Sequence, residues 1–357
     1  MAEEKKTLAQ RLLLWYQSHH RQLPWRDSRD PYRIWISEIM LQQTTVQTVV
    51  PYFEKWMIRF PDIETLSKAS QQDVLKAWQG LGYYQRVKNI HKTSRIVMER
   101  FEGRIPSDYQ DLREMPGFGP YTAAAVLSMA FNEPYPAVDA NIRRVWMRLE
   151  GIKKRPGPQI DPFIKKRLLS HMPRTRPGIF NQASMELGAL VCKSKNPQCL
   201  VCPLTPFCKA FEKGEQEVIP LPVKRSYKNI EAVVAIIEKR GRYLIQKRPS
   251  RGLLADLWEF PGGKKKPSET LEEALRREVR EELGAEIAAC TRFVSIKHAY
   301  TRFRVTLHAF FCVLENLPPL FPERHRWVSL EGMKNYPFPS GSVKVIKHLE
   351  ASSEGRP

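Results

Sequence analysis

Apolar positions recur with helical spacing along most of the chain. Apolar side chains return every three or four residues over residues 8–20, 35–60, 71–79 and 85–101. This period is typical of amphipathic helices that bury one face. Prolines and glycines interrupt the pattern between these stretches, and the alternation typical of strands is scarce before residue 211. The first part of the chain is therefore predicted to be all-helical.

The hydrophobic pattern changes after residue 217. Residues 217–227 read Glu-Val-Ile-Pro-Leu-Pro-Val-Lys-Arg-Ser-Tyr, and the two prolines and the basic run indicate a linker. Residues 231–238, 242–247, 293–299 and 303–314 alternate with a period of two, which predicts strands, whereas 269–283 and 340–349 have helical spacing. We therefore expect a helical domain over residues 1–217, a linker over 218–229 and an α/β domain over 230–357.

The charge of the chain indicates a polyanionic partner. The 357 residues carry a net charge of +20, with 34 basic and 22 acidic residues up to residue 224 and 24 and 16 after it. A surplus of this size, shared by both predicted domains, is typical of proteins that neutralise nucleic-acid phosphates. Solubilising surface charge would account for a few of these units but not for all of them.

No segment has the composition of a secretion signal or a membrane span. Residues 1–10 are charged, and no stretch approaches the roughly 20 apolar residues that a spanning helix needs. We therefore expect an intracellular protein in a reducing compartment, without a membrane anchor.

Four cysteines fall within 17 residues, at Cys192, Cys199, Cys202 and Cys208. In a long chain without a secretion signal, such a run is typical of a metal site rather than of disulfides. Structural zinc sites usually have two C-x2-C pairs, whereas here one such pair has two outlying cysteines. The uneven spacing favours a [4Fe–4S] cluster over zinc, and over four unrelated buried cysteines.

A glycine-rich turn precedes a predicted helix at Met115-Pro-Gly-Phe-Gly-Pro-Tyr-Thr. Backbone N–H groups after Gly117 and Gly119 can bind a phosphate, although a simple helix–turn–helix corner has the same composition. Twenty residues after Gly119 stands Asp139, which also suits an ordinary helix N-cap. Together with the cysteine run, this pattern resembles the helix-hairpin-helix DNA glycosylase superfamily, in its iron–sulfur branch, over residues 8–211.

Tyr121 distinguishes two branches of this superfamily. Endonuclease III-like enzymes for oxidised pyrimidines place a nucleophilic lysine in the hairpin, whereas this chain has Gly119-Pro-Tyr121. Trp25-Arg-Asp, Ser37-Glu-Ile-Met-Leu-Gln-Gln-Thr, Gly80-Leu-Gly-Tyr-Tyr and Glu186-Leu-Gly-Ala-Leu-Val-Cys resemble the MutY family of adenine DNA glycosylases. The resemblance implies a monofunctional hydrolase that removes adenine opposite 8-oxoguanine or guanine and starts base excision repair. A damage-binding protein without turnover is a third reading.

The resemblance also assigns catalytic roles. Glu38 matches the general acid that protonates the leaving adenine, and its apolar neighbours could raise its pKa, although the sequence is equally compatible with a solvated helical glutamate. Asp139 matches the carboxylate that stabilises the cationic sugar. Tyr121 and Asn141 match residues that support it. Ala140 replaces the glycine that is commoner after this aspartate, and a methyl there is tolerated unless the position needs a positive φ.

Further residues match the family's DNA contacts. The adenine leaves the duplex before it is cleaved. The resemblance places Arg26, Gln182 and Glu186 around the adenine, Leu41 beside it, and Gln43 and Tyr83 in the vacated stack. Packing explains each of these residues almost as well.

The predicted α/β domain contains a Nudix box. The segment Gly263-x5-Glu269-x7-Arg277-Glu278-Val-x-Glu281-Glu282-x-Gly284 fits it, with Ala285 in place of a larger aliphatic residue. Glu278, Glu281 and Glu282 would share one helix face, a cluster that suits Mg²⁺, although a solvated charged face is the plainer alternative. The preceding Trp-Glu-Phe-Pro-Gly-Gly resembles MutT. The resemblance implies a domain that recognises 8-oxoguanine, and the intact box adds Mg²⁺-dependent hydrolysis of 8-oxo-dGTP as an alternative activity.

The expected lesion-reading loop departs from the family. Where MutY proteins often have Phe-Ser-His, this chain has Tyr300-Thr301-Arg302. Thr301 keeps a hydroxyl for the oxidised base, and Arg302 replaces an imidazole with a permanent charge. We expect a monomer that binds mispaired double-stranded DNA and acts in the bacterial cytoplasm at the nucleoid.

Overall fold

The described residues form two compact units. The structure is a computed structural model that describes residues 6–26, 28–223, 227–300 and 303–354. One unit comprises Met1–Lys68 and Asn89–Lys224, and the other comprises Ala69–Lys88 and Arg225–Pro357. Residues 69–88 therefore belong to the same compact unit as the C-terminal part of the chain. The sequential boundary at residues 218–229 stays a prediction.

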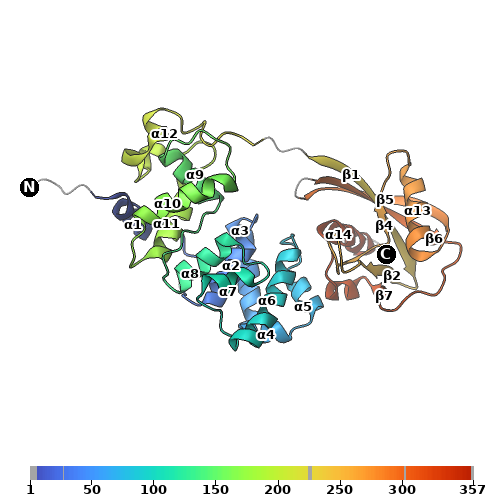
Figure 1. The fold of residues 1–357 in the computed structure, drawn as a ribbon. Coiled ribbons are helices and arrows are strands. Elements are labelled where there is room, and N and C mark those ends of the chain that lie inside the picture. The colour runs from blue at the N-terminus through green and yellow to red at the C-terminus, as the bar shows by residue number, and fades with distance from the viewer. Residues whose placement is uncertain (1–5, 27, 224–226, 301–302, 355–357) are drawn as a thin grey trace, which may run out of the picture. The chain divides into compact units, whose positions relative to one another are not determined.

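Helices account for the chain up to residue 212 (Figure 1). The predicted helices at 8–20, 71–79 and 85–101 are confirmed, but the single stretch at 35–60 is two helices with a polar break at residues 42–45. The α-helices are α1 Leu8–His19, α2 Pro31–Leu41, α3 Val46–Arg59, α4 Ile63–Lys68, α5 Gln71–Ala77, α6 Gln85–Phe101, α7 Tyr109–Glu114, α8 Pro120–Ala130, α9 Ala140–Leu149, α10 Asp161–His171, α11 Pro177–Leu190 and α12 Lys209–Glu212. Short 3₁₀ turns occur at Pro158–Ile160, Cys199–Val201 and Thr205–Phe207.

Polar N-caps fix where several of these helices begin. Thr7 and Gln10 form a capping box at α1, and Asp30 accepts a hydrogen bond from the Tyr32 backbone N–H at the start of α2. Asp108 and Asp139 cap α7 and α9 in the same way. Each cap satisfies a backbone N–H that the helix itself leaves without a partner.

One core joins the helices that surround the cysteine run. Apolar residues of α1, α9, α10 and α11 pack together, including Trp146, Phe180 and Leu187. Cys192, Cys202 and Cys208 pack against the edge of this core. The cysteine loop is therefore attached to the helices that carry Asp139 and Glu186. No helix in the described parts of the chain is long and apolar enough to span a membrane.

The C-terminal part is a mixed sheet between helices, which confirms the α/β prediction. Its strands are β1 Lys228–Lys239, β2 Arg242–Lys247, β3 Trp258–Glu259, β4 Gly262–Lys264, β5 Ile287–Tyr300, β6 Phe303–Leu314 and β7 His325–Ser329. The order is β3-β2-β1-β6-β5, with β4 on β1 and β7 on β2. β1 and β6 are parallel, whereas β1–β2 and β5–β6 are antiparallel. Arg240 and Gly241, both with positive φ, close the predicted hairpin.

The period of two in β1 divides its side chains between the two faces of the sheet. Val234 and Ile236 pack with Val345 and Leu349 of α14, which spans Ser340–Glu354. The intervening residues of β1 pack on the other side with Leu275 and other apolar residues of α13, which spans Leu271–Leu283. Both helices are labelled beside the strands in Figure 1. Because both faces are covered, residues 233–237 are all buried, and the centre of β1 is a continuous apolar run rather than an apolar–polar alternation.

Candidate functional site

The helical unit contains a cavity of about 720 Å³. Its walls come from α2, α8, the first turn of α9, α11 and the loops after Arg21 and Leu41. The cavity collects most of the residues that the sequence predicts for catalysis and adenine binding. These are Arg26, Glu38, Leu41, Gln43, Tyr121, Asp139, Asn141, Gln182 and Glu186.

Glu38 is a buried carboxyl group in the wall of this cavity. Its exposed fraction is 6%, and the Tyr121 hydroxyl donates a hydrogen bond to its Oε2 atom. Burial raises the pKa of Glu38, the Tyr121 hydrogen bond lowers it, and the charge of Asp139 raises it again, with a net value of about 7. Such a carboxyl group can hold a proton near neutral pH and release it to a base. A solvated helical glutamate, the alternative from sequence, does not describe this residue.

Asp139 is the N-cap of α9 and faces the same cavity. Its Oδ1 accepts a hydrogen bond of 2.7 Å from the Ile142 backbone, and its Oδ2 accepts one of 2.9 Å from Asn141 Nδ2. Burial raises the pKa of Asp139 and outweighs these hydrogen bonds, which lower it. The residue is therefore both a cap and a wall residue of the cavity. Ala140 is the first residue of α9 and not one of the residues with positive φ, so its methyl group fits.

The glycine-rich turn connects α7 with α8. Gly117 has a φ of 89°, in the region that favours glycine, and Gly119 is the N-cap of α8 with Pro120 at its first position. A Cβ atom at Gly119 would meet nothing within 4 Å, so the backbone there is open on that side. The turn places Tyr121 in the first turn of α8, beside Glu38.

Two arginines surround Glu186 at the polar side of the cavity. Arg26 Nη2 lies 2.6 Å from Glu186 Oε2, and Arg21 donates from Nε to Oε1 at 2.8 Å and from Nη2 to Oε2 at 2.7 Å. Burial would raise the pKa of Glu186, but these hydrogen bonds outweigh it and hold the pKa at about 2. Beside them, Tyr16 donates to Gln182 Oε1 at 2.8 Å. The sequence did not single out Arg21 or Tyr16, because no local motif marks either residue.

A chain of hydrogen bonds connects Asp139 with the cysteine loop. Asn141 binds Asp139, Arg144 Nη2 donates to Asn141 Oδ1 at 3.0 Å, and Arg144 Nε donates to the Cys192 carbonyl at 2.8 Å. Arg144 also donates to the Gly188 carbonyl at 2.7 Å. A Cβ atom on Gly188 would lie 2.7 Å from Asn141 Cβ, so the close approach of α11 and α9 requires glycine here.

The four predicted cluster cysteines are free thiols, and Cys192, Cys202 and Cys208 pack against one core. Burial raises the pKa values of Cys199, Cys202 and Cys208, and the charges of neighbouring cysteines add to this. Arg148, which is 2% exposed, places Nη1 3.3 Å from Cys192 Sγ. Among the described residues, no group of three or more His, Cys, Asp or Glu side chains is arranged to hold a metal ion.

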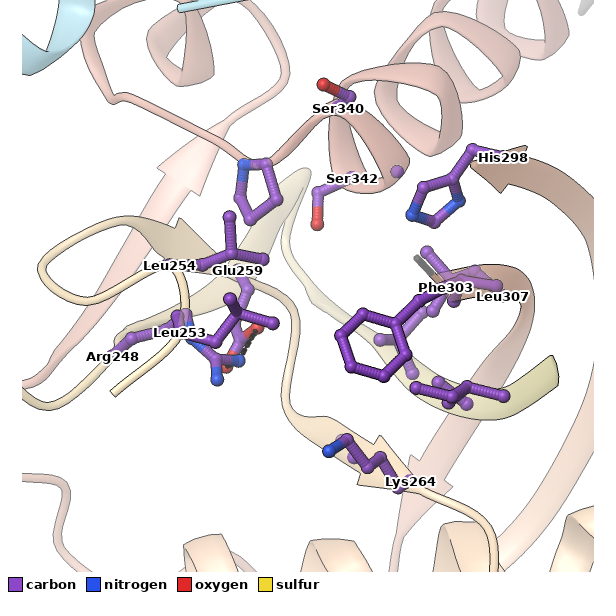
Figure 2. Close-up of a pocket in the computed structure, with 18 of the residues that line it drawn as sticks. Arg248, Leu253, Leu254, Glu259, Lys264, His298, Phe303, Leu307, Ser340 and Ser342 are labelled. Carbon is purple, nitrogen blue, oxygen red and sulfur yellow. Dashed lines mark hydrogen bonds and ion pairs between the residues drawn. The ribbon is translucent and has the colours of Figure 1, made fainter. Parts of the chain in front are cut away.

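The C-terminal unit contains a second cavity, of about 1040 Å³ (Figure 2). Glu259, Glu278 and Glu282 line it, and Arg248 binds Glu259 there. Figure 2 shows this pair beside Leu253 and Leu254, with Phe303 and His298 drawn elsewhere on the wall. Burial raises the pKa of Glu259 to about 7, although the charge of Arg248 lowers it. Glu259 stands in the Trp-Glu-Phe-Pro segment and was not predicted as a site residue.

The Nudix box only partly faces this cavity. Glu278 and Glu282 line the cavity, whereas the Glu281 side chain is 56% exposed and binds Arg277 at 3.2 Å. Arg277 also binds Glu269 at 2.6 Å and Glu278 at 2.8 Å. Tyr83 lines the cavity with a φ of 49°. The Tyr300 side chain, Thr301 and Arg302 lie outside the described residues, so the lesion-reading loop stays a prediction.

Both the helical part and the α/β part of the chain are similar to known protein families. Residues 36–166 match the HhH-GPD superfamily of base excision DNA repair proteins, and residues 232–348 match the NUDIX domain. Adenine DNA glycosylase from Buchnera aphidicola (subspecies Acyrthosiphon pisum) is 32% identical over 97% of this chain and 98% of its own length. The human adenine DNA glycosylase is 31% identical over 96% of this chain and 74% of its own length.

A solved structure supports the fold of the helical part. A thermostable thymine-DNA glycosylase covers 57% of this chain and 95% of its own, with a TM-score of 0.53 and 28% identity. An endonuclease III–DNA complex at 23% identity has a TM-score of 0.50 and shares the fold. Together with the near full-length relatives, these likenesses establish that the chain belongs to the adenine DNA glycosylase family, hydrolases of base excision repair.

Proposed function

We propose that this adenine DNA glycosylase removes adenine paired with 8-oxoguanine, and more slowly adenine paired with guanine. The observation that carries the chemistry is that the buried Glu38 and the partly buried Asp139 line one cavity, with Tyr121 bound to Glu38. Two carboxyl groups in different environments suit a reaction that needs one proton donor and one stabilising anion.

Glu38 donates its proton to the leaving adenine. At a pKa of about 7, a large fraction of the side chain is protonated at neutral pH. The proton goes to N7 of the base, the bond between base and sugar breaks, and the bonding electrons leave with the adenine. Glu38, now a carboxylate, then accepts a proton from the water that attacks the sugar.

Asp139 stabilises the positive sugar that forms when the bond breaks. A carboxylate near the anomeric carbon lowers the free energy of an oxocarbenium ion. Asn141 and the α9 backbone hold both oxygens of Asp139, which fixes the direction of the side chain. Because Tyr121 occupies the hairpin position and offers no amine, we infer hydrolysis without a lyase step.

Arg26, Glu186 and Gln182 recognise the flipped adenine. Glu186 stays ionised far below neutral pH and accepts from the exocyclic amine, while the arginine and glutamine offer further polar contacts. Arg21 and Arg26 offset the charge of Glu186, which is 1% exposed and would be costly to bury alone. Leu41 and Gln43 also line the cavity.

We infer that Cys192, Cys199, Cys202 and Cys208 hold a [4Fe–4S] cluster. Four thiols within one short loop, three of which pack against the same core, suit this group. A bound cluster supplies a covalent brace for the loop. Arg148 and Arg144, which bind Cys192, Lys193 and the Gly188 carbonyl, connect this loop to α9 and α11.

Hydrolysis of 8-oxo-dGTP is a second candidate function. It is favoured by the Nudix box and by the cavity lining, where Glu259, Glu278 and Glu282 supply oxygens of the kind that Mg²⁺ prefers but are not arranged around one metal position. The test is Mg²⁺-dependent pyrophosphate release by the full chain, with Glu282→Gln as control. Release no faster than that of the control would remove this candidate.

One panel of duplexes tests the leading function. Single-turnover base release is measured on duplexes with 8-oxoguanine:A, guanine:A or thymine glycol. We expect release from the first two, faster from the lesion pair, and none from thymine glycol. Faster release of thymine glycol would favour the endonuclease III-like reading, and binding without release would favour a damage-binding protein.

A further inference from the structure

Residues 69–88 contact the C-terminal strands and loops through a buried ion pair. Lys88 Nζ lies 2.6 Å from Asp256 Oδ2, with 16% and 9% of the two side chains exposed. Gln71 Nε2 donates to the same Asp256 oxygen at 3.1 Å, and Gln72 Nε2 donates to the Asp256 carbonyl at 3.2 Å. Asp256 is therefore the centre of a polar contact made by α5 and the start of α6.

Additional hydrogen bonds extend this contact on both sides of Asp256. Trp258 Nε1 donates to Gln72 Oε1 at 3.0 Å, and Lys76 Nζ donates to the Tyr336 carbonyl at 3.0 Å. The Tyr84 hydroxyl donates to the Phe338 carbonyl at 3.3 Å. Donors and acceptors match over the whole contact, as in a specific interface.

The loop that holds Asp256 has a fixed and unusual shape. Leu254 and Asp256 have φ values of 59° and 64°, and such conformations persist in residues other than glycine only where the surroundings hold them. Burial would raise the pKa of Asp256, but the hydrogen bond and charge of Lys88 outweigh it and lower the pKa. Lys88 therefore finds an ionised partner at neutral pH.

In the sequence, the loop of Tyr83 lies between Gln72 and Lys88, which both take part in this contact. Gly80, Gly82 and Tyr83 have φ values of 107°, 70° and 49°, so the loop is tightly bent. The loop lines the same cavity as Glu259, Glu282 and Phe303. A shift of the 253–258 loop would therefore reach residues 80–84 through Lys88 on one side and Gln71 and Gln72 on the other.

We propose that the Lys88–Asp256 pair is a positioning contact that couples lesion reading to the Tyr83 loop. The pair sets the position of residues 80–84 against the cavity of the Nudix-like domain, and so makes adenine release sensitive to the base opposite. Lys88 and Asp256 then determine specificity without touching the reacting atoms. This inference rests on the proposed function and on two predictions from the sequence, namely that the C-terminal domain reads 8-oxoguanine and that Tyr83 enters the vacated stack.

A double-mutant cycle tests the coupling. Asp256→Asn, Lys88→Met and the double variant are compared with wild type, with Lys88→Arg as the charge-preserving variant. Glu286→Gln is the matched control, because it removes an ion pair to Arg280 in the same domain away from the contact. The measurements are single-turnover adenine release from 8-oxoguanine:A and guanine:A duplexes, and hydrogen exchange of residues 69–88 in the protein without DNA.

We expect each single variant to lower the preference for 8-oxoguanine:A about tenfold, and the double variant to lower it no further. Release from guanine:A stays unchanged, Lys88→Arg keeps the preference, and exchange of residues 69–88 becomes faster in Asp256→Asn. Additive effects of the two substitutions, or an unchanged preference, would overturn the inference.

The two failures can be told apart. If the wild-type protein shows no preference for the lesion, the proposed lesion reading is wrong, and hydrogen exchange then decides whether the contact exists. If the wild type prefers the lesion but Asp256→Asn changes neither the preference nor the exchange, only the coupling is wrong.

Discussion

Arg144 Nη2 donates a hydrogen bond of 3.0 Å to Asn141 Oδ1, and Asn141 in turn holds Asp139. The same guanidinium group binds the carbonyl groups of Cys192 and Gly188. The position of Asp139 therefore depends on the cysteine loop and on α11.

Removing this guanidinium group should slow adenine release. We expect Arg144→Met to lower the single-turnover rate about 10- to 100-fold, because misplaced catalytic groups lose that much. Arg143→Met is the matched control, since Arg143 binds Asp161 and not Asn141. Its rate should stay within about threefold of wild type. Equal rates for the two variants would contradict the positioning role.

A methyl group at Gly188 should have a similar effect through sterics. Gly188→Ala places Cβ 2.7 Å from Asn141 Cβ, so the side chain that orients Asp139 must move. We expect the rate of adenine release to fall at least about 10-fold, with duplex binding retained. Ala140→Gly, at the first position of α9, is the control and should keep the wild-type rate. If the Gly188→Ala protein released adenine at the wild-type rate, α9 would be able to shift without loss of activity.

Glu186 should stabilise the helical unit at neutral pH. Its pKa is lowered from the ordinary 4.5 to about 2 by Arg21 and Arg26, so its contribution is present above pH 4.5 and is lost as the pH falls toward 2. Glu186→Gln leaves two arginines without their anion and should lower the free energy of unfolding by about 2 kcal/mol at pH 7. Urea unfolding at pH 7 and pH 4 measures this. If the difference in free energy of unfolding between wild type and Glu186→Gln were larger at pH 4 than at pH 7, the assignment would be wrong.

The cysteine loop should depend on its metal group. Cys202→Ser should lower bound iron and sulfide together and reduce affinity for duplex DNA, because the loop loses its brace. Iron and sulfide analysis of the purified protein measures the first effect, and a binding titration measures the second. Cys290→Ser, far along the chain, should change neither. Purified wild type that contains zinc without sulfide would show that the cluster assignment is wrong.

Much of the fold was predictable because its signals are local. Helical spacing located α1, α5 and α6. The short apolar run of β1 is local too, because one strand face packs on α13 and the other on α14 and residues 233–237 are all buried. The break between α2 and α3 was not predicted. Gln42–Thr45 is polar but lacks proline and glycine, and Gln43 takes a positive φ there.

The parts of the site that were not predicted lie far apart in sequence. Arg21 and Glu186 are separated by 165 residues, and nothing near Arg21 marks it as a partner. The same holds for Lys88 and Asp256, 168 residues apart. Glu38 and Asp139 were predictable because each stands in a recognisable motif. The burial of Glu38 and the nearby charge of Asp139, which raise the pKa of Glu38, required the packed structure.

The central claim is that Glu38 is the proton donor, and the pH dependence of single-turnover adenine release tests it most directly. Glu38 acts only when protonated, and its pKa is about 7. We predict that the wild-type rate falls about tenfold per pH unit well above pH 7, and that Glu38→Gln is about 10²- to 10⁴-fold slower, without this fall. A Glu38→Gln protein that releases adenine at the wild-type rate, with the wild-type pH profile, would contradict the claim.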